Sequence, residues 1–120
     1  MSRPAALVTG SAKGVGKAIA LALAHDGYDV AVHYRSSRAA AEAVATQVAA
    51  AGVASAVLRA DVRDEEQARS LVDDAHAAFG RLDVLINNVG DYHHGPLHEL
   101  TGAVWRDMFA SNLNSTFYTC

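Results

Sequence analysis

Three glycines lie close together near the amino terminus, in the stretch LVTGSAKGVGKAIA at 7–20. Gly10, Gly14 and Gly16 stand between a short apolar run and the start of a helical pattern. A turn without side chains lets backbone N–H groups approach a phosphate, and the positive end of the following helix dipole favours the same negative charge. The pattern predicts a phosphate-binding turn, although a glycine-rich turn without a ligand would have the same composition.

The elements that must position this turn are an alternating series of short apolar runs and helical patterns. Strands are expected at 5–9, 29–34, 54–60 and 82–88, and helices at 14–25, 37–52, 64–79 and 104–120. Strands that are apolar throughout and separated by helices are parallel and covered on both faces. Right-handed crossovers then predict an open, doubly wound α/β sheet of the Rossmann type, with about four strands in the order 3-2-1-4. Asp64 is expected to cap the third helix, with Gln67 at the capping-box position.

Composition narrows the class of protein further. The 120 residues form one domain at most, and 51% hydrophobic with 19% charged residues is typical of an ordered protein. The net charge of −3 argues against nucleic acid or an anionic membrane as a partner. No apolar run has the length of a membrane span. Cys120 is the single cysteine, so a reducing, cytoplasmic location is expected.

Polar residues after the later strands complete a pattern that resembles the short-chain dehydrogenase/reductase family. TGSAKGVG at 9–16 matches the family's T-G-x-x-x-G-x-G turn, DV at 61–62 its adenine contact, and NNVG at 87–90 its N-N-A-G with one change, at Val89. The resemblance covers the whole chain in register and implies a nicotinamide cofactor, with residues 1–120 as its dinucleotide-binding domain. It also implies a catalytic role for Asn112. The implied cofactor-binding residues are Gly10, Ser11, Lys13, Gly14, Val15, Gly16, Tyr34, Arg35, Ser36, Asp61, Val62, Asn88, Val89 and Gly90.

The end of the second expected strand favours NADP(H) over NAD(H). An acidic residue there would bind a free ribose 2′-hydroxyl and repel a 2′-phosphate, but HYRSS at 33–37 has no carboxylate. Arg35 offers a guanidinium fork, Ser36 a hydroxyl and Lys13 a second cation. The alternative for Arg35 is an ordinary solvated charge.

The proton-transfer residues of the resembled family are missing from the sequence. The family uses a tyrosine, a lysine four residues later on the same helix face, and a serine. The lysines here are Lys13 and Lys17, and no tyrosine has a lysine four residues later. The chain is therefore expected to be the amino-terminal portion of a reductase and a poor catalyst alone. Self-association is expected through the edge of the fourth strand or through the helix from Val104.

The resemblance implies an NADP(H)-dependent reductase that converts a small carbonyl substrate to an alcohol, similar to 3-oxoacyl-acyl-carrier-protein reductases. A pteridine reductase-like enzyme is an alternative, because VHYRSS at 32–37 resembles that subgroup, although Gly14 stands where it usually has arginine. A nucleotide-binding module without catalysis is another. No metal site is expected from His93, His94 and His98, because Gly95 and Pro96 interrupt the helix that such ligands need.

Overall fold

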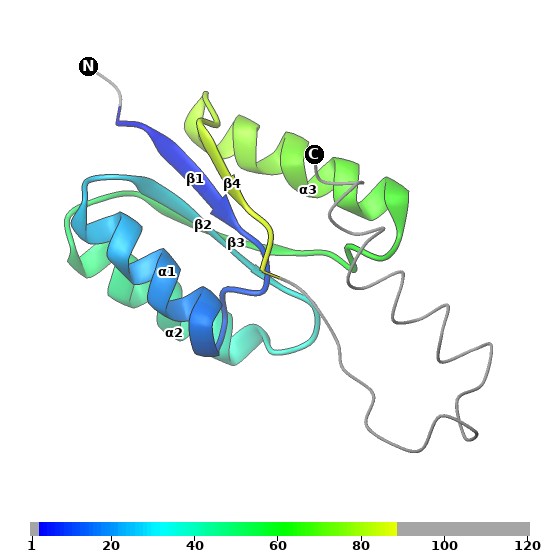
Figure 1. Ribbon diagram of the computed structural model, residues 1–120, viewed down its shortest axis with the longest axis horizontal. Coiled ribbons are helices and arrows are strands. Elements are labelled where there is room, and N and C mark those ends of the chain that lie inside the picture. Colours follow the sequence, from blue (N-terminus) through cyan, green and yellow to red (C-terminus); the bar gives the residue numbers. More distant parts are fainter. Residues whose placement is uncertain (1–2, 89–120) are drawn as a thin grey trace.

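The computed structural model describes residues 3–88, in which strands and helices alternate (Figure 1). The strands are β1 (Ala5–Val8), β2 (Asp29–Tyr34), β3 (Ser55–Arg59) and β4 (Val84–Ile86). The helices are α1 (Gly14–His25), α2 (Arg38–Ala50) and α3 (Glu65–Phe79). Some of the predictions fall outside the described residues: those for Val89, Gly90, His93, His94, His98, Asn112 and the helix from Val104.

The four strands form one parallel sheet in the order β3-β2-β1-β4, which confirms the predicted order. At the carboxyl end of β1, Val8 pairs with Val32 of β2 and with Ile86 of β4. Val32 pairs in turn with Val57 of β3. Because parallel strands share a direction, the segments that follow them leave the sheet at the same edge.

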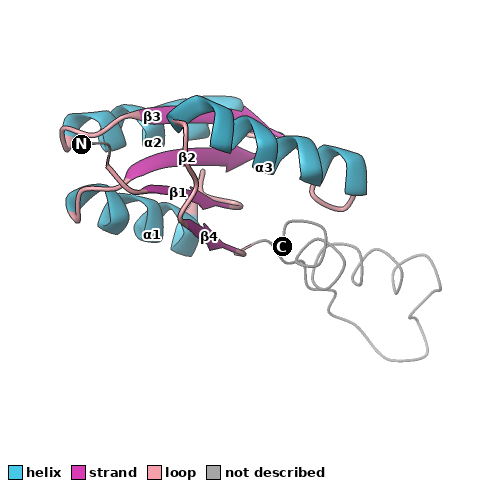
Figure 2. Cartoon of the chain, turned by 90° about the horizontal axis from the view of Figure 1, so that it is seen from above, coloured by secondary structure: helices cyan, strands magenta, loops and turns pink. Residues whose placement is uncertain are grey.

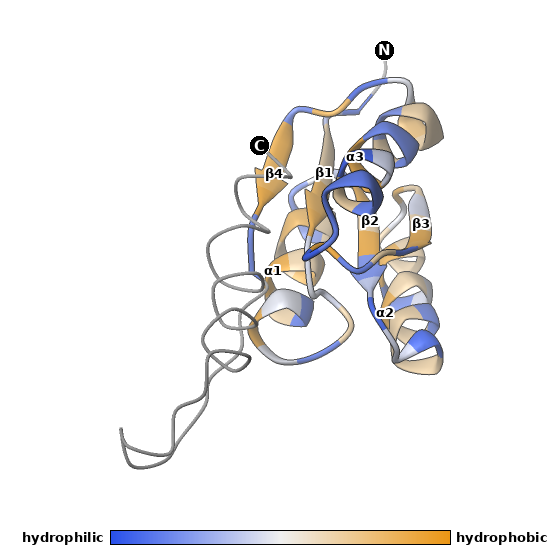
Figure 3. Ribbon diagram, turned by 90° about the vertical axis from the view of Figure 1, so that its right-hand side faces the viewer, coloured by the Kyte–Doolittle hydropathy of each residue, from blue (hydrophilic) through white to orange (hydrophobic). Residues whose placement is uncertain are grey.

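Helices cover the sheet on both faces (Figure 2). Val8, Val30 and Val32 pack on the side of α1 and α2, whereas Leu7 and Ala31 pack on the side of α3. All five side chains are fully buried. Alternate residues of one strand thus enter two separate apolar layers, and the strands are correspondingly hydrophobic (Figure 3). None of the helices in residues 3–88 is long and apolar enough to cross a membrane.

The observed elements agree with the predicted ones to within two residues at each end, and β4 differs most. The apolar run predicts a strand at 82–88, but the strand pairs only over Val84–Ile86. The paired length of β4 is limited by its neighbour β1, because β1 ends at Val8 and the chain then enters the glycine turn. The next residue, Thr9, still donates its N–H to the Ile86 carbonyl at 3.0 Å, which is the last backbone bond between the two segments before they separate.

Two aspartates close the amino-terminal edge of the sheet. Asp83, just before β4, accepts the Ala5 N–H at 2.9 Å and the Arg81 Nε–H at 2.7 Å. Asp29, at the start of β2, accepts the Ala54 N–H at 2.9 Å. The bond from Arg81, supported by the bond from Ala5, lowers the pKa of Asp83 to about 2.

Asp83→Asn is expected to lower stability at neutral pH but not in strong acid. The folded-state pKa is below the ordinary value of 3.8, so the carboxylate stabilises the fold above about pH 4, and this contribution is lost as the pH falls toward about 2. Urea midpoints of the wild type and the variant at neutral pH and near pH 2 measure the effect, with the exposed Asp73→Asn as control. A difference in stability between the wild type and Asp83→Asn that is the same at both pH values would contradict this prediction.

Candidate functional site

The carboxyl edge of the sheet brings most of the predicted cofactor-binding residues of the described part together. The turn after β1, the segment after β2, the segment after β3 and the residues after β4 all leave the sheet there. A pocket of about 160 Å³ lies between the first two of these segments. It is lined by Gly10, Ala12, Lys13, His33, Tyr34, Arg35, Ser36 and Ser37.

The three glycines of the turn meet two different requirements. Gly10 and Gly14 have φ values of +63° and +58°, a conformation that side chains rarely adopt. Gly16 lies inside α1 without positive φ, but a Cβ there would lie 2.3 Å from the Gly10 carbonyl oxygen. Gly16 therefore lets α1 pack directly on the turn, whereas the other two let the chain turn.

The first turn of α1 presents N–H groups at this edge. The earliest backbone bond of the helix runs from the Lys17 N–H to the Lys13 carbonyl at 3.2 Å. The N–H groups of Gly14, Val15 and Gly16 precede it and so have no intrahelical partner. The Val15 side chain is 68% exposed, so the start of the helix is open to solvent. Such a helix end favours a bound anion.

Asn88 holds the turn from the side of β4. Its N–H donates to Thr9 Oγ1 at 2.8 Å, and its side-chain Nδ2 donates to the Gly10 carbonyl at 3.4 Å. The sequence motif predicts a contact between Asn88 and the cofactor. In the structure its side chain positions the backbone of the turn, which the sequence pattern alone does not indicate.

His33 holds the same turn from the side of β2, a role that the sequence motifs do not reveal. Its Nδ1 accepts the Gly10 N–H at 2.8 Å, and its backbone N–H donates to Ser11 Oγ at 2.9 Å. Its Nε2 lies 2.8 Å from the Ala60 carbonyl, at the end of β3. The available signal is a polar residue directly after the apolar run VAV of the segment DVAVHY, which begins with Asp29.

Three predicted cofactor-binding residues have buried side chains. The Ser11 side chain is fully buried and bonded to His33, while Tyr34 is 7% and Val62 3% exposed, both within apolar clusters. Val62 belongs to the layer under α3 and Tyr34 to the layer under α1 and α2, although Tyr34 also lines the pocket. Their predicted contacts with a cofactor would have to come mainly from backbone atoms.

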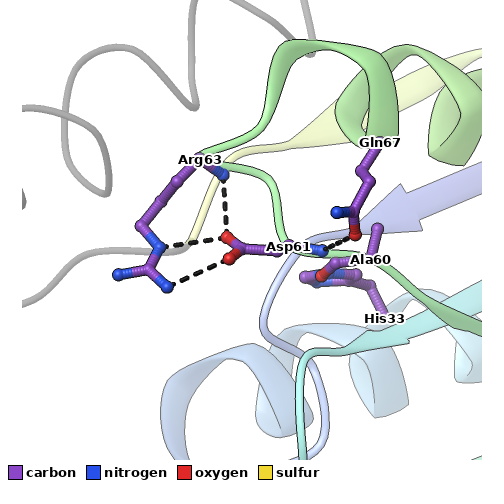
Figure 4. A network of polar contacts seen from close by, with 5 residues as sticks. All are labelled: His33, Ala60, Asp61, Arg63 and Gln67. Atoms are coloured by element: carbon purple, nitrogen blue, oxygen red, sulfur yellow. Dashed lines mark hydrogen bonds and ion pairs between the residues drawn. The ribbon is translucent and has the colours of Figure 1, made fainter.

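Asp61 lies at the edge as predicted, but its carboxylate already has a partner (Figure 4). Arg63 donates from Nε to Oδ1 and from a terminal nitrogen to Oδ2, each at 3.0 Å. The hydrogen bonds from Arg63 are the main reason that the pKa of Asp61 lies below its ordinary value. The sequence predicts that Asp61 accepts from an adenine amino group, and any such contact would add to this ion pair or replace part of it.

Gln67 supports the same segment in a way that differs from the predicted capping box. Asp64 caps α3 as expected, with Oδ1 accepting the N–H groups of Glu66 at 2.9 Å and Gln67 at 3.2 Å. The Gln67 side chain, however, accepts the N–H of Asp61 at 2.9 Å rather than that of Asp64. The reason is that the Asp64 N–H already donates to the Asp61 carbonyl at 3.0 Å.

The charges around the pocket are positive on the side that is predicted to bind a phosphate. Lys13, Arg35 and Ser36 line it and have solvent access, and its lining residues include no carboxylate. The Arg35 charge also contributes to the lowered pKa of Asp61 across the edge. Arg38, three residues further along, is instead bonded to Glu42 at 2.9 Å. Within residues 3–88 no three histidine, cysteine or acidic side chains are grouped as metal ligands would be.

The parallel sheet with helices on both faces, and the glycine turn that opens α1 at its carboxyl edge, define a Rossmann-type α/β protein. A family model described as short chain dehydrogenase matches residues 4–120. The chain belongs to the short-chain dehydrogenase/reductase family, as the sequence motifs indicate.

Individual relatives agree with this assignment. The chain is 48% identical over 108 residues to an uncharacterized oxidoreductase of Methylorubrum extorquens, a match that covers 90% of this chain and 44% of the relative. It is 40% identical to the 3-oxoacyl-(acyl-carrier-protein) reductase FabG of Staphylococcus aureus, over 93% of this chain and 46% of that protein. The chain thus spans about half the length of the curated relatives that it matches.

A solved structure matches the described architecture closely. The short chain dehydrogenase from Burkholderia cenocepacia J2315, determined in complex with NADP, superposes with a TM-score of 0.93 at 38% identity. The match covers 98% of this chain and 47% of that one.

Proposed function

We propose that this chain binds NADP(H) and forms the cofactor-binding part of a reductase that converts a carbonyl to an alcohol. The observation that carries the proposal is the pocket between the glycine turn and the end of β2. It is lined by Lys13, the N-cap residue of α1, and by Arg35 and Ser36, and it has no carboxylate among its lining residues. A pyrophosphate and a 2′-phosphate both require positive charge and N–H or O–H donors, and the pocket supplies them.

The described residues fit this cofactor in distinct places. The pyrophosphate would lie over the open N–H groups at the start of α1, where even a Cβ added to Gly14 would meet no other atom within 4 Å. The 2′-phosphate would lie between Arg35, Ser36 and Lys13, and the adenine near Asp61. When bound, NADPH supplies the hydride for carbonyl reduction; these residues bind and orient it.

Relatives support the class of reaction and the choice of cofactor. The Burkholderia cenocepacia structure contains NADP, and a blue fluorescent protein from a metagenomic library, 36% identical with a TM-score of 0.92, was solved with NADPH. The Staphylococcus aureus relative is a 3-oxoacyl-(acyl-carrier-protein) reductase.

We infer a small carbonyl substrate of that general kind, with Asn112, Val89 and Gly90 completing the predicted site. Self-association through the β4 edge or the helix from Val104 stays a prediction.

Arg35→Ala is expected to weaken NADPH binding about 10- to 100-fold while changing NADH binding less than about threefold. A charge-assisted hydrogen bond contributes about 1.5 to 3 kcal/mol, and only NADPH has the phosphate that would receive it. Titration of the wild type and the variant with both cofactors, followed by nicotinamide fluorescence, measures the difference. Arg69→Ala is the control, because Arg69 is exposed and bonded to Glu65 on α3. Equal affinity of the wild type for the two cofactors would overturn the assignment of the 2′-phosphate.

A further inference from the structure

His33 is a titratable side chain in the centre of the candidate site, with 2% of its surface exposed. It is the last residue but one of β2, and through three hydrogen bonds it connects segments that are far apart in the sequence. These are the glycine turn, through Gly10 and Ser11, and the end of β3, through Ala60. Each of these segments carries a predicted contact with the cofactor.

The partners of the ring determine its protonation state. The Gly10 N–H can only donate, so Nδ1 must accept and carries no proton. The Ala60 carbonyl can only accept, so Nε2 must donate and carries the proton. The ring is therefore neutral and present as the Nε2–H tautomer. A proton added to Nδ1 would place two donors opposite each other across the 2.8 Å contact with Gly10.

We infer that His33 is a positioning residue for NADP(H): its neutral ring holds the Gly10 N–H, and with it the glycine turn, in the conformation that receives the pyrophosphate. The inference rests on the proposed function, since it concerns the same cofactor. The inference adds to the proposed function that the affinity for the cofactor depends on the protonation state of His33, a residue that lies beneath the phosphate-binding backbone.

The groups that face His33 act on its protonation in opposite directions. Burial lowers its pKa below 6.5 and is the largest effect, while the Ala60 carbonyl and the charge of Asp61 act to raise it. Asp61 is itself paired with Arg63. Lys13 from the turn and Arg35 from the segment after β2 line the same pocket, and α3 contributes apolar side chains to this face of the sheet. β1 has no charged residue.

The lowered pKa fixes the direction of the pH effects. Folding favours the neutral ring, so the contribution of His33 to stability is complete above about pH 6.5 and is lost as the pH falls below that value. The affinity for NAD⁺, which has no 2′-phosphate that titrates near pH 6, should be constant where the folded protein keeps the ring neutral. Below the folded-state pKa it should fall about tenfold for each pH unit, if binding requires the neutral ring.

Two substitutions separate the bond to Gly10 from the bond to Ala60. In His33→Asn the side-chain amide oxygen can take the position of Nδ1 and accept the Gly10 N–H, whereas in His33→Gln the longer amide reaches toward Ala60 and leaves the Gly10 N–H unpaired. At pH 7.5, isothermal titration with NADP⁺ should give His33→Asn within about threefold of the wild type and His33→Gln at least about tenfold weaker. The exposed His25→Gln is the control and should bind as the wild type does.

A second measurement uses the unaltered chain and remains decisive if a variant does not fold. The pKa of the His33 ring is followed by NMR in the free protein and with saturating NADP⁺, with its resonances assigned from through-bond and NOE connectivities in the isotope-labelled wild-type chain. By reciprocal linkage, a tenfold preference of the cofactor for the neutral ring lowers this pKa by about one unit. NAD⁺ should lower it as well, because the argument concerns the pyrophosphate turn. A pKa that is unchanged or raised overturns the inference.

The outcomes distinguish this inference from the proposed function. A wild-type chain that does not bind NADP⁺ at pH 7.5 overturns the proposed function and this inference with it. A wild-type chain that binds NADP⁺, with His33→Gln binding equally well, overturns this inference alone. Circular dichroism at each pH confirms that the folded protein is being compared.

Discussion

Gly16→Ala is expected to lower the midpoint of thermal unfolding by roughly 10 °C, corresponding to a loss of about 2 kcal/mol. The new Cβ would lie 2.3 Å from the Gly10 carbonyl oxygen, 2.5 Å from Asn88 Nδ2 and 2.9 Å from the Gly10 carbonyl carbon. Two of these three atoms belong to the backbone of the turn, so the overlap cannot be relieved by a change of rotamer. Either α1 or the glycine turn has to move.

The expected loss of stability is informative, because replacing glycine by alanine inside a helix usually raises stability. At an open position inside a helix, alanine is more favourable than glycine by about 1 kcal/mol. A stability equal to or above that of the wild type would therefore contradict the close packing of α1 on the turn. Thermal and urea unfolding measure the change, and Val15→Ala, at the exposed neighbouring position, should stay within about 0.5 kcal/mol of the wild type. Gly16→Ala should also lose NADP⁺ binding, because the displaced turn is the predicted pyrophosphate site.

The fold could be predicted from the sequence because its signals are local and repeated. Each strand is a short apolar run and each helix has its own end signal, such as Gly80, which ends α3 with a φ of +75°. Once the elements alternate, the handedness of the crossovers leaves few possible strand orders. The lengths of the strands were less predictable. β4 is limited to three residues by its partner β1, and a partner cannot be read from the run itself.

The candidate site was predictable in position but not in its internal contacts. The glycine spacing indicates the turn, yet the separate role of Gly16 depends on atoms of Gly10 and of Asn88, which is far along the chain from it. The role of His33 is hidden for the same reason, since Gly10 and Ala60 become its neighbours only when the sheet has formed. The pair of Asp61 and Arg63 is local, but residue types two positions apart do not reveal that both carboxylate oxygens are bonded.

In the proposed function the described residues of the site bind and orient the cofactor, and within residues 3–88 no tyrosine is followed by a lysine four residues later. Tyr28 precedes β2, at the edge of the sheet opposite the glycine turn, and the six residues of that strand separate the two edges by about 20 Å. Tyr34 lines the pocket but is 7% exposed, within an apolar cluster. Lys13 and Lys17 are the only lysines in the sequence, and neither follows a tyrosine by four residues.

A polypeptide of these 120 residues is therefore expected to bind NADPH but to reduce ketones or 3-oxoacyl thioesters at least about 10²- to 10⁴-fold more slowly than a full-length relative. That range is the usual contribution of general acid catalysis. Mass-verified protein and the Staphylococcus aureus reductase are compared on the same 3-oxoacyl thioester, with consumption of NADPH followed by absorbance and binding checked by fluorescence. Any residual rate should survive Tyr34→Phe, because that hydroxyl has no lysine partner four residues on. A rate within about tenfold of the relative would mean that another residue of this chain, outside the tyrosine and lysine pattern, supplies the proton.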